Sequence, residues 1–305
     1  SSVAAAHTAA HVVQAVECSA AMVVSVSLKL LVRTSLIYAN AGMLSLDGRC
    51  KTLDANANGY IRAEGVGALV LHHSVNEDVE VRLQGSAIRQ DGRSASLTAP
   101  NASAQRMLIR AAMSAAGTST GVLRAVEMHG TGTALGDPTE ASAILTDLDT
   151  SAGALALGAA KANYGHAEPT AGMLGLVAAA NGLGSRTLAG FAHLKRLNPL
   201  VLSNLHLQPS LVPTQKLTGG DVTVKGVSAF GYSGTIAHVV LKGSGVAARP
   251  HERHRYRHIF FWWRKVHDQS ASTKESASQT SYSVEWASLK SNCSFVKNER
   301  MVHSV

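Results

Sequence analysis

Apolar positions along the 305-residue chain recur with two periods, and together they predict an α/β protein. Helical patterns, the first of them apolar around most of its circumference, cover residues 3–16, 102–117, 137–148 and 167–184. Asp137 is expected to cap its helix, with Pro138 in the first position. Short aliphatic or β-branched runs predict strands at 21–30, 67–72, 79–88, 124–130, 154–163, 221–231 and 235–243. Strands alternating with helices indicate a layered α/β fold whose strand ends carry the chemistry.

The composition limits the classes of protein to which the chain belongs. With 46% hydrophobic content, it can bury the core of one large or two modest domains. No apolar run approaches the roughly 20 residues that span a bilayer, and the first twenty residues lack the basic start of a signal peptide. Three cysteines, Cys18, Cys50 and Cys293, form no CxxC pair. We therefore expect no transmembrane segment, no secretion, no disulfide framework and no metal site.

The net charge of +8 is concentrated near the C-terminus. Residues 244–305 hold ten Lys and Arg but five Asp and Glu, which accounts for +5. Within this segment, basic and aromatic residues alternate over residues 249–265. In some proteins such a pattern binds nucleic acid through phosphate contacts and base stacking. No nucleic-acid motif accompanies it, so a basic segment lying over the domain is the favoured interpretation. Residues 268–281 are polar and Ser-rich, as flexible linkers are.

Three segments at predicted strand ends combine into a candidate site. "VEMHGTGTALGDPTE" places His129 beside a tight loop rich in backbone N–H and hydroxyl donors. "KANYGHAEPTAG" places Lys161 five residues before His166, across a turn. "SAFGYSGTIAH" contains Gly231 and Gly234, whose backbone amides can approach a ligand closely. Each segment alone is a weak signal. Two His-bearing turns and a glycine loop in one α/β unit make a stronger one.

These segments resemble the ketosynthase (β-ketoacyl synthase) domain of modular type I polyketide synthases, in the thiolase-fold superfamily. Five blocks match in the family's order and spacing, at residues 50–71, 85–105, 126–144, 161–172 and 227–241. The resemblance covers about residues 1–243 and implies a thiolase-like layered α/β/α/β/α fold, here incomplete. It assigns residues 1–78 to the end of the N-terminal half, 79–243 to the complete C-terminal half, and 244–305 to a basic, aromatic post-ketosynthase linker and flexible tail. No nucleic-acid partner is then expected.

The resemblance implies a decarboxylative Claisen condensation between an acyl thioester and a malonyl-type carrier-protein thioester. The family's nucleophile is a Cys at the start of a buried helix, where the helix dipole favours the thiolate. Ser1 and Ser2 resemble the residues directly after that Cys, so the nucleophile is expected immediately before Ser1 and absent from this chain. Cys18, Cys50 and Cys293 do not match its position.

The resemblance also implies roles for individual residues. His129 and His166 are expected to donate N–H bonds to the thioester oxygen of the enolate, and Lys161 to order the polar network that holds their tautomers. Thr131 and Thr133 are expected to contact the 4'-phosphopantetheine arm that delivers substrates. No bound cofactor is expected.

The glycine loop between the last two strands is the second substrate-binding element that the resemblance implies. Tyr232, between Gly231 and Gly234, is expected to gate the acyl pocket, while its backbone N–H completes an oxyanion hole. Ile236 replaces a usual Asn, so one polar contact is lost.

Several functions and partners remain as alternatives. The chain is either part of a condensing acyltransferase or a non-catalytic remnant or interaction module without its nucleophile; a decarboxylase that condenses nothing is a third hypothesis. Partners implied by the resemblance are an acyl carrier protein, a second copy in a homodimer, and an adjacent acyltransferase or other synthase domain. An intracellular location, cytoplasmic or plastid, is expected. A missing core strand predicts an unpaired sheet edge and poor solubility of the chain alone.

Overall fold

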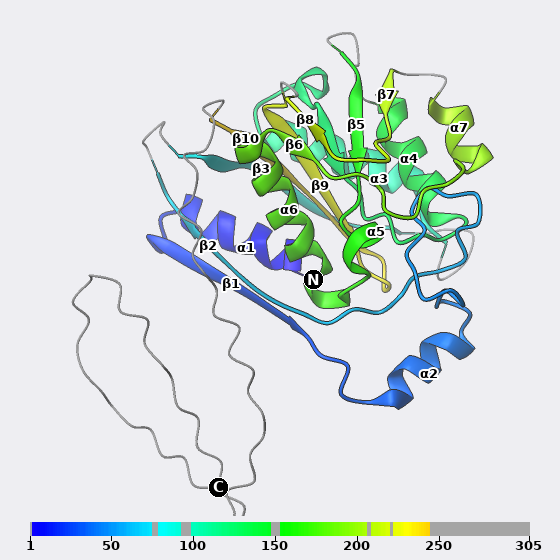
Figure 1. Ribbon diagram of the computed structural model, residues 1–305. Coiled ribbons are helices and arrows are strands. Elements are labelled where there is room, and N and C mark those ends of the chain that lie inside the picture. The colour runs from blue at the N-terminus through cyan, green and yellow to red at the C-terminus, as the bar shows by residue number, and fades with distance from the viewer. Residues whose placement is uncertain are drawn as a thin grey trace, which may run out of the picture. The chain divides into compact units, whose positions relative to one another are not determined.

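A computed structural model describes residues 2–74, 79–92, 99–147, 153–205, 209–219 and 222–244. These residues belong to one compact unit (Figure 1). The predicted linker and tail, apart from Ser244, lie outside the described residues. No helix among the residues described is long and apolar enough to cross a membrane.

A mixed six-stranded sheet forms the centre of the fold. Its strand order is β3-β10-β9-β4-β5-β7, with β10 antiparallel to both of its neighbours and the strands from β9 to β7 parallel. Bounds are β3 Val81–Gln90, β4 Ala125–Glu127, β5 Leu155–Gly158, β7 Ser210–Leu211, β9 Val224–Phe230 and β10 Thr235–Gly243. β4, β9 and β10 occur where alternating or β-branched runs predict them. Because β4 and β9 are parallel neighbours, their carboxyl ends bring His129 and Phe230 together.

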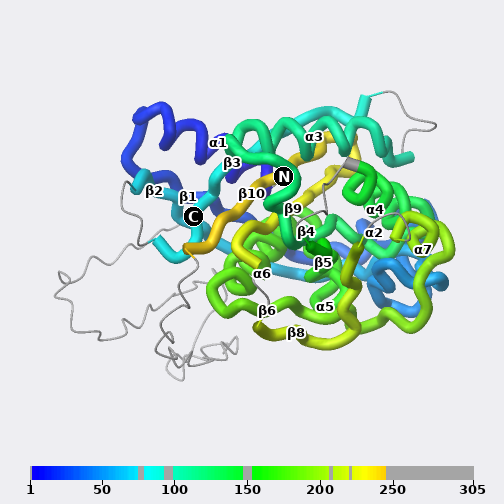
Figure 2. The backbone as a smooth tube through the Cα atoms, turned by 90° about the horizontal axis from the view of Figure 1, so that it is seen from above, coloured from blue at the N-terminus to red at the C-terminus, as the bar shows by residue number. Residues whose placement is uncertain are grey.

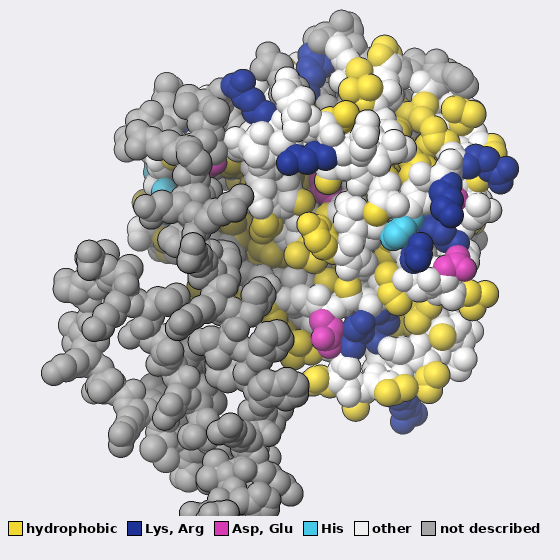
Figure 3. Space-filling view, viewed as in Figure 1, with side chains coloured by type: hydrophobic (Ala, Val, Ile, Leu, Met, Phe, Trp, Pro, Cys, Tyr) yellow, Lys and Arg dark blue, Asp and Glu magenta, His cyan; other side chains and the backbone are white. Residues whose placement is uncertain are grey.

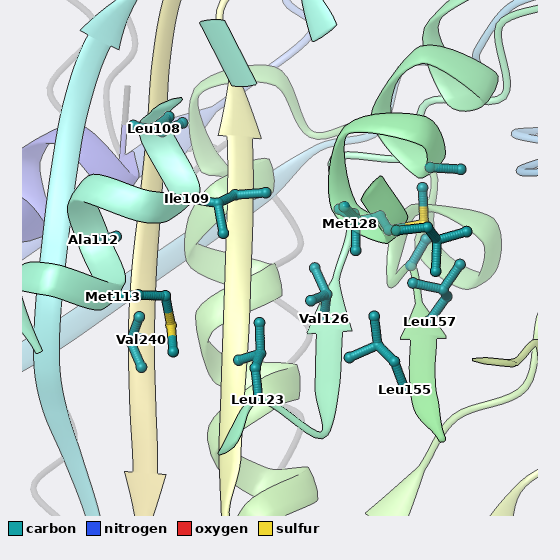
Figure 4. Packing of buried hydrophobic residues seen from close by; sticks show 14 of the residues in the cluster. Leu108, Ile109, Ala112, Met113, Leu123, Val126, Met128, Leu155, Leu157 and Val240 are labelled. Atoms are coloured by element: carbon teal, nitrogen blue, oxygen red, sulfur yellow. The ribbon is translucent and has the colours of Figure 1, made fainter. Parts of the chain in front are cut away.

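Helices α3 (Ala102–Ala115), α4 (Gly136–Asp147) and α7 (Pro199–Leu205) form a layer on one face of this sheet. In α3 the residues spaced by three and four positions are apolar, and this stripe is buried against β3 and β10. Figure 4 shows Leu108 and Ile109 of α3, Leu157 of β5 and Val240 of β10 as members of one buried core cluster. A fully buried Leu contributes about 1.5–3 kcal/mol through its removal from water.

The opposite face of the sheet is covered by α1 (Ser2–Gln14) and α6 (Ala171–Ser185). Beyond these helices lies a separate two-stranded antiparallel sheet, β1 (Ala20–Ser27) and β2 (Gly65–His72). Figure 1 shows α1 and α6 lying between the six-stranded sheet and the β1–β2 sheet, and Figure 2 shows α3 and α6 on either side of β9. The described residues therefore form four layers, in the order sheet, helices, sheet, helices. α1 buries one face only, through Val3, Ala6, Ala10 and Val13, so its all-round apolar pattern overstated its burial.

The outer face of the β1–β2 sheet is apolar and exposed. Met22, Val24 and Val26 of β1 are exposed and alternate with buried or half-buried residues, and Val66 and Val70 of β2 alternate with half-buried residues. Within the described residues, β1 pairs with β2 alone. The expected exposed apolar face is thus present, while poor solubility stays a prediction. On the face in Figure 3, hydrophobic side chains are interspersed with Lys and Arg, and fewer carboxylates are visible.

Several elements differ from the sequence-based predictions. Helix α2 (Val32–Asn40) and the short pair β6 (Thr187–Leu188) and β8 (Leu217–Thr218) were not predicted. Lys161 lies on a short helix, α5 (Lys161–Tyr164), rather than at a strand end. Asp137 does not cap α4, because its carboxylate accepts hydrogen bonds from the backbone N–H groups of Leu53 and Gly132 instead.

Candidate active site

A cavity of about 870 Å³ opens where the loops after several strands converge. Its lining comes from both halves of the sequence, as the topology of an α/β sheet predicts for the carboxyl ends of parallel strands. Seven of the eight site residues expected from the sequence line it: His129, Thr131, Thr133, His166, Gly231, Tyr232 and Gly234. The eighth, Lys161, is buried behind the wall.

His129 is held in place by contacts to its backbone and to its ring. Its backbone N–H donates to Oε1 of Glu140 at 2.7 Å, and the other carboxylate oxygen accepts from Gly130 N at 2.9 Å. The backbone N–H of Phe230, at the end of β9, donates to His129 Nδ1 at 3.2 Å. A nitrogen that accepts a hydrogen bond carries no proton, so the proton of a neutral His129 resides on Nε2.

His166 is arranged in the same way by a different loop. The backbone N–H of Glu168 donates to His166 Nδ1 at 3.2 Å, which again leaves the proton on Nε2. Its ring is edge-on to Tyr60, with centroids 4.9 Å apart, and to His129, with centroids 5.6 Å apart and planes at 88°. The two imidazoles therefore offer two Nε2–H donors to one cavity.

Both imidazoles are neutral at pH 7. Burial lowers the pKa of His166 to about 3, with a smaller contribution from the positive charge of Lys161. Burial, Lys161 and the other imidazole hold the pKa of His129 well below its usual value. A neutral donor pair stabilises negative charge that develops on a bound oxygen without first losing a proton.

Lys161 lies among buried carboxylates. Glu127, two residues before His129, accepts a hydrogen bond from the backbone N–H of Ala160, next to Lys161. Burial lowers the pKa of Lys161, and the negative charges of Glu127 and Glu140 oppose this shift. Burial also raises the pKa of Glu140 to about 8 and that of Asp137 to about 6. The sequence analysis missed Glu127 and Glu140, although both lie in the "VEMHGTGTALGDPTE" segment.

The glycine-rich loop after His129 passes very close to the backbone of the N-terminal half. Gly132 has φ 82°, and a Cβ there would lie 2.7 Å from the backbone N of Lys51, so only glycine fits. Thr133 accepts a hydrogen bond through Oγ1 from Gly136 N at 3.2 Å, at the start of α4. Thr131 faces the cavity in the same loop.

The turn between β9 and β10 forms another side of the cavity. Gly231 N donates to Thr235 O at 2.7 Å, and Gly234 has φ 91°, so the turn is tight. Tyr232 between them is 61% exposed at the cavity wall. Phe230, which the sequence analysis did not single out, lies with its ring centroid 5.3 Å from that of His129. Ile236 is fully buried in β10, so this position lies in the core rather than in the loop.

Neither described cysteine lines the cavity. Cys50 is buried, and its Sγ accepts a hydrogen bond from Ile61 N at 3.4 Å; burial raises the pKa of its thiol. Cys18 lies beyond the end of α1 and is half-buried. Cys293 lies outside the described residues. The start of α1, in contrast, lies beside the segment that follows His166, because Ser2 Oγ accepts a hydrogen bond from Met173 N at 2.9 Å.

Comparisons with known proteins identify the family of the chain. The model of the β-ketoacyl synthase N-terminal domain matches residues 1–76, and that of the C-terminal domain matches residues 81–195. The chain is 36% identical over 256 residues to a phenolphthiocerol/phthiocerol polyketide synthase polypeptide of Mycobacterium tuberculosis, covering 81% of this chain and 16% of that one. It is 38% identical over 264 residues to polyketide synthase ThaG of Burkholderia thailandensis, covering 80% and 5%.

Solved structures of ketosynthase domains are also similar to this chain. The oxazolomycin ketosynthase domain OzmH KS7 of Streptomyces albus superposes with a TM-score of 0.75 at 31% identity, over 82% of this chain and 46% of that one. The module 6 ketosynthase of the bacillaene synthase of Bacillus subtilis gives 0.73 at 33% identity, over 80% and 46%. The chain spans less than half the length of these domains and a small part of the curated relatives. The predicted thiolase-like α/β fold is confirmed, and the chain belongs to the β-ketoacyl synthase family, as a ketosynthase domain of the polyketide synthase type.

Proposed function

We propose that this chain contributes the decarboxylating half of a ketosynthase active site. The observation that carries the proposal is the pair of neutral imidazoles, His129 and His166, whose Nδ1 atoms both accept backbone hydrogen bonds. A malonyl-type thioester loses carbon dioxide, and the electrons of the broken C–C bond move onto the thioester carbonyl to form an enolate. Two Nε2–H donors at that oxygen stabilise the developing negative charge.

Lys161 acts by position rather than as a base. It lies behind the cavity wall among Glu127 and Glu140, and Glu140 accepts hydrogen bonds from the backbone of both His129 and Gly130. Its positive charge helps to keep both imidazoles neutral. Substitution of Lys161 then affects the orientation and protonation of the histidines, not a proton transfer to substrate.

Condensation requires in addition an acyl group on a nucleophile. We infer that a thiol directly preceding Ser1 supplies it, since the start of α1 contacts the segment that follows His166. In the complete site, the enolate carbon attacks the acyl carbon of that thioester, and the thiolate leaves.

Substrates enter on the 4'-phosphopantetheine arm of an acyl carrier protein, with no cofactor bound to the chain. Thr131 and Thr133 contact that arm, which is supported by their place in the loop at the cavity. Tyr232, with Gly231 and Gly234, gates the acyl pocket from the turn opposite. A homodimer and neighbouring synthase domains complete the assembly. The family match favours this function over the non-catalytic interaction module.

The proposal is tested with malonyl-pantetheine and the chain as it stands. Acetyl-pantetheine formation is followed by mass spectrometry for the chain and for His129→Ala and His166→Ala. Each substitution is expected to lower the rate by about 10²–10³-fold, the usual cost of deleting one such donor. His72→Ala, which removes an exposed imidazole in β2, is the matched control. A folded chain that forms no acetyl thioester, or a His166→Ala variant that keeps the full rate, would contradict the proposal.

A further inference from the structure

The backbone at Glu168 adopts a conformation that its sequence disfavours. Its φ angle is 45°, in the left-handed region that non-glycine residues rarely occupy because of steric conflict at Cβ. Pro169 follows, and a residue before proline is normally extended. Such a conformation persists only where neighbouring contacts hold it. The residues that hold Glu168 therefore have a specific structural task.

The unusual backbone has a direct consequence for His166. The Glu168 N–H is the donor that reaches His166 Nδ1, across only two residues, at 3.2 Å. If the backbone at Glu168 relaxed to an extended conformation, this N–H would turn and the bond would be lost. The ring would then be free to carry its proton on either nitrogen.

Arg62 is the residue that holds Glu168. Its Nε donates to Glu168 Oε1 at 2.5 Å and its Nη2 donates to Oε2 at 3.1 Å, so the two planar groups meet through two parallel hydrogen bonds. The Arg62 side chain is 7% exposed and that of Glu168 is 21% exposed. Two parallel bonds fix both the position and the direction of the Glu168 carboxylate. The Glu168 backbone, to which this side chain is attached, is thereby held in its left-handed conformation.

Arg62 is itself anchored to other segments. Its Nη1 donates to Ser35 Oγ at 2.8 Å, and its guanidinium lies 5.1 Å from the ring centroid of Tyr38; both partners belong to α2. Its backbone runs beside His166, because Ala63 N donates to His166 O at 2.9 Å. The guanidinium is therefore anchored to α2 while it binds the carboxylate of Glu168, and the Arg62 backbone is anchored beside His166.

We propose that Arg62 is a positioning residue for His166: through its paired hydrogen bonds to Glu168 it holds the left-handed backbone whose amide selects the Nε2–H tautomer. The contribution of this tautomer to decarboxylation rests on the proposed function; the tautomer itself does not. His129 has no part in this arrangement, because its Nδ1 partner is Phe230 N in β9. One imidazole is therefore fixed by the sheet and the other by an ion pair.

The difference between the two histidines supplies an internal control. In the chain labelled with ¹⁵N-histidine, long-range ¹H–¹⁵N correlation spectra distinguish Nδ1–H from Nε2–H tautomers. Both residues are expected as pure Nε2–H forms. In Arg62→Lys, which keeps the charge but not the two parallel bonds, His166 is expected to populate both tautomers while His129 stays unchanged. Arg33→Lys, an exposed substitution in α2, is the matched control and is expected to change neither.

A second variant tests the mechanism and guards against misfolding. Adding Glu168→Gly to Arg62→Lys is expected to return His166 to the Nε2–H form, because glycine adopts the left-handed conformation at no steric cost. Should Arg62→Lys not melt cooperatively, Glu168→Gln is measured instead and is expected to give a smaller tautomer mixture. An unchanged His166 in a folded Arg62→Lys or Glu168→Gln variant would overturn the positioning role.

Turnover of malonyl-pantetheine separates this proposal from the proposed function. Arg62→Lys is expected to lower the rate by about tenfold, less than deleting a donor outright. A tautomer mixture with an unchanged rate would leave the positioning role standing and contradict the use of His166 as a donor. A lower rate with an unchanged tautomer would overturn the positioning role alone.

Discussion

The six-stranded sheet and the β1–β2 sheet both carry apolar side chains on both faces, yet only the six-stranded sheet is covered on both sides. In the six-stranded sheet, Val239 and Val240 point to opposite faces and both are fully buried. In the two-stranded sheet, Val23 is 4% exposed while its neighbour Val24 is 54% exposed. Adjacent side chains point to opposite faces in both sheets, but only in the six-stranded sheet are both faces buried.

The sheet that is buried on both faces is also the sheet that carries most of the candidate active site. His129 lies in the loop that follows β4, and His166 follows α5, the short helix after β5; helices pack on both faces of this six-stranded sheet. The two-stranded sheet contributes to the site mainly through the segment between β1 and β2, which includes Tyr60 and Arg62. Substitutions in the two sheets are accordingly expected to differ most in their effect on stability.

The largest effect is expected from a cavity in the six-stranded sheet. Leu157→Ala removes a fully buried side chain of β5 and is expected to lower the free energy of unfolding by about 4 kcal/mol, within the usual range for such changes. Leu46→Ala, at a position 97% exposed, is the control and is expected to leave stability unchanged. Chemical denaturation followed by circular dichroism measures both. A loss below about 1 kcal/mol at position 157 would contradict the comparison.

The next effect depends on pH and comes from a buried histidine in the same sheet. His238 is fully buried in β10, where burial lowers its pKa to about 4, below the usual 6.5. The unfolded state therefore binds more protons between these values. The contribution of the neutral His238 to the free energy of unfolding is complete above about pH 6.5. It is lost as the pH falls, by on the order of 3 kcal/mol at pH 4.

The substitution His238→Leu tests this linkage. The variant has no imidazole to protonate at this position. Between pH 7 and pH 4 its free energy of unfolding is therefore expected to fall by less than that of the wild type, with a difference on the order of 3 kcal/mol. Leu46→Ala, an exposed position without a titratable group, is the control and is expected to keep the wild-type slope. Thermal melts across this pH range give the measurement. Parallel curves for His238→Leu and the wild type would show that the buried imidazole carries no such linkage.

The smallest effect is expected from the exposed face of the two-stranded sheet. Val24→Ala is expected to change the free energy of unfolding by less than about 0.5 kcal/mol, as surface changes usually do. Val240→Ala, the same substitution in the six-stranded sheet, is expected to cost about 2 kcal/mol. The pair is compared by denaturant titration under one set of conditions. Equal losses would mean that Val24 is covered in solution, which would remove the contrast between the sheets.

The sequence predicted most of the fold because its strands and helices have regular patterns and recognisable motifs. Seven of the predicted site residues face one cavity, since the strand ends that carry them are neighbours in the sheet. The pattern did not predict α2, none of whose residues is buried, or the short helix that carries Lys161. It also assigned Asp137 to a cap, because a local motif does not reveal that Leu53 N, 84 residues away, competes for the carboxylate.

The link between Arg62 and Glu168 illustrates a further limit. The two residues are 106 positions apart; Glu168 falls at the start of the predicted helix 167–184, and Arg62 lies in a segment for which no element was predicted. Neither periodicity nor spacing carries information on which distant charge a buried guanidinium meets. A left-handed backbone at a glutamate is equally invisible in the sequence, because the residue type argues against it.

The seam between the two halves of the chain has a consequence for building hybrid enzymes. Asp137 accepts from Leu53 N, Asp54 accepts from the backbone N–H groups of Lys195 and Arg196, and Thr52 donates to Gly130 O. In each of these contacts a side chain on one half meets the main chain of the other. Main-chain groups are the same whatever the residue type. Exchanging residues 1–78 between homologues that keep the Thr, the two Asp and the Arg62–Glu168 pair therefore preserves these contacts, even where the side chains beside the joined main chain differ.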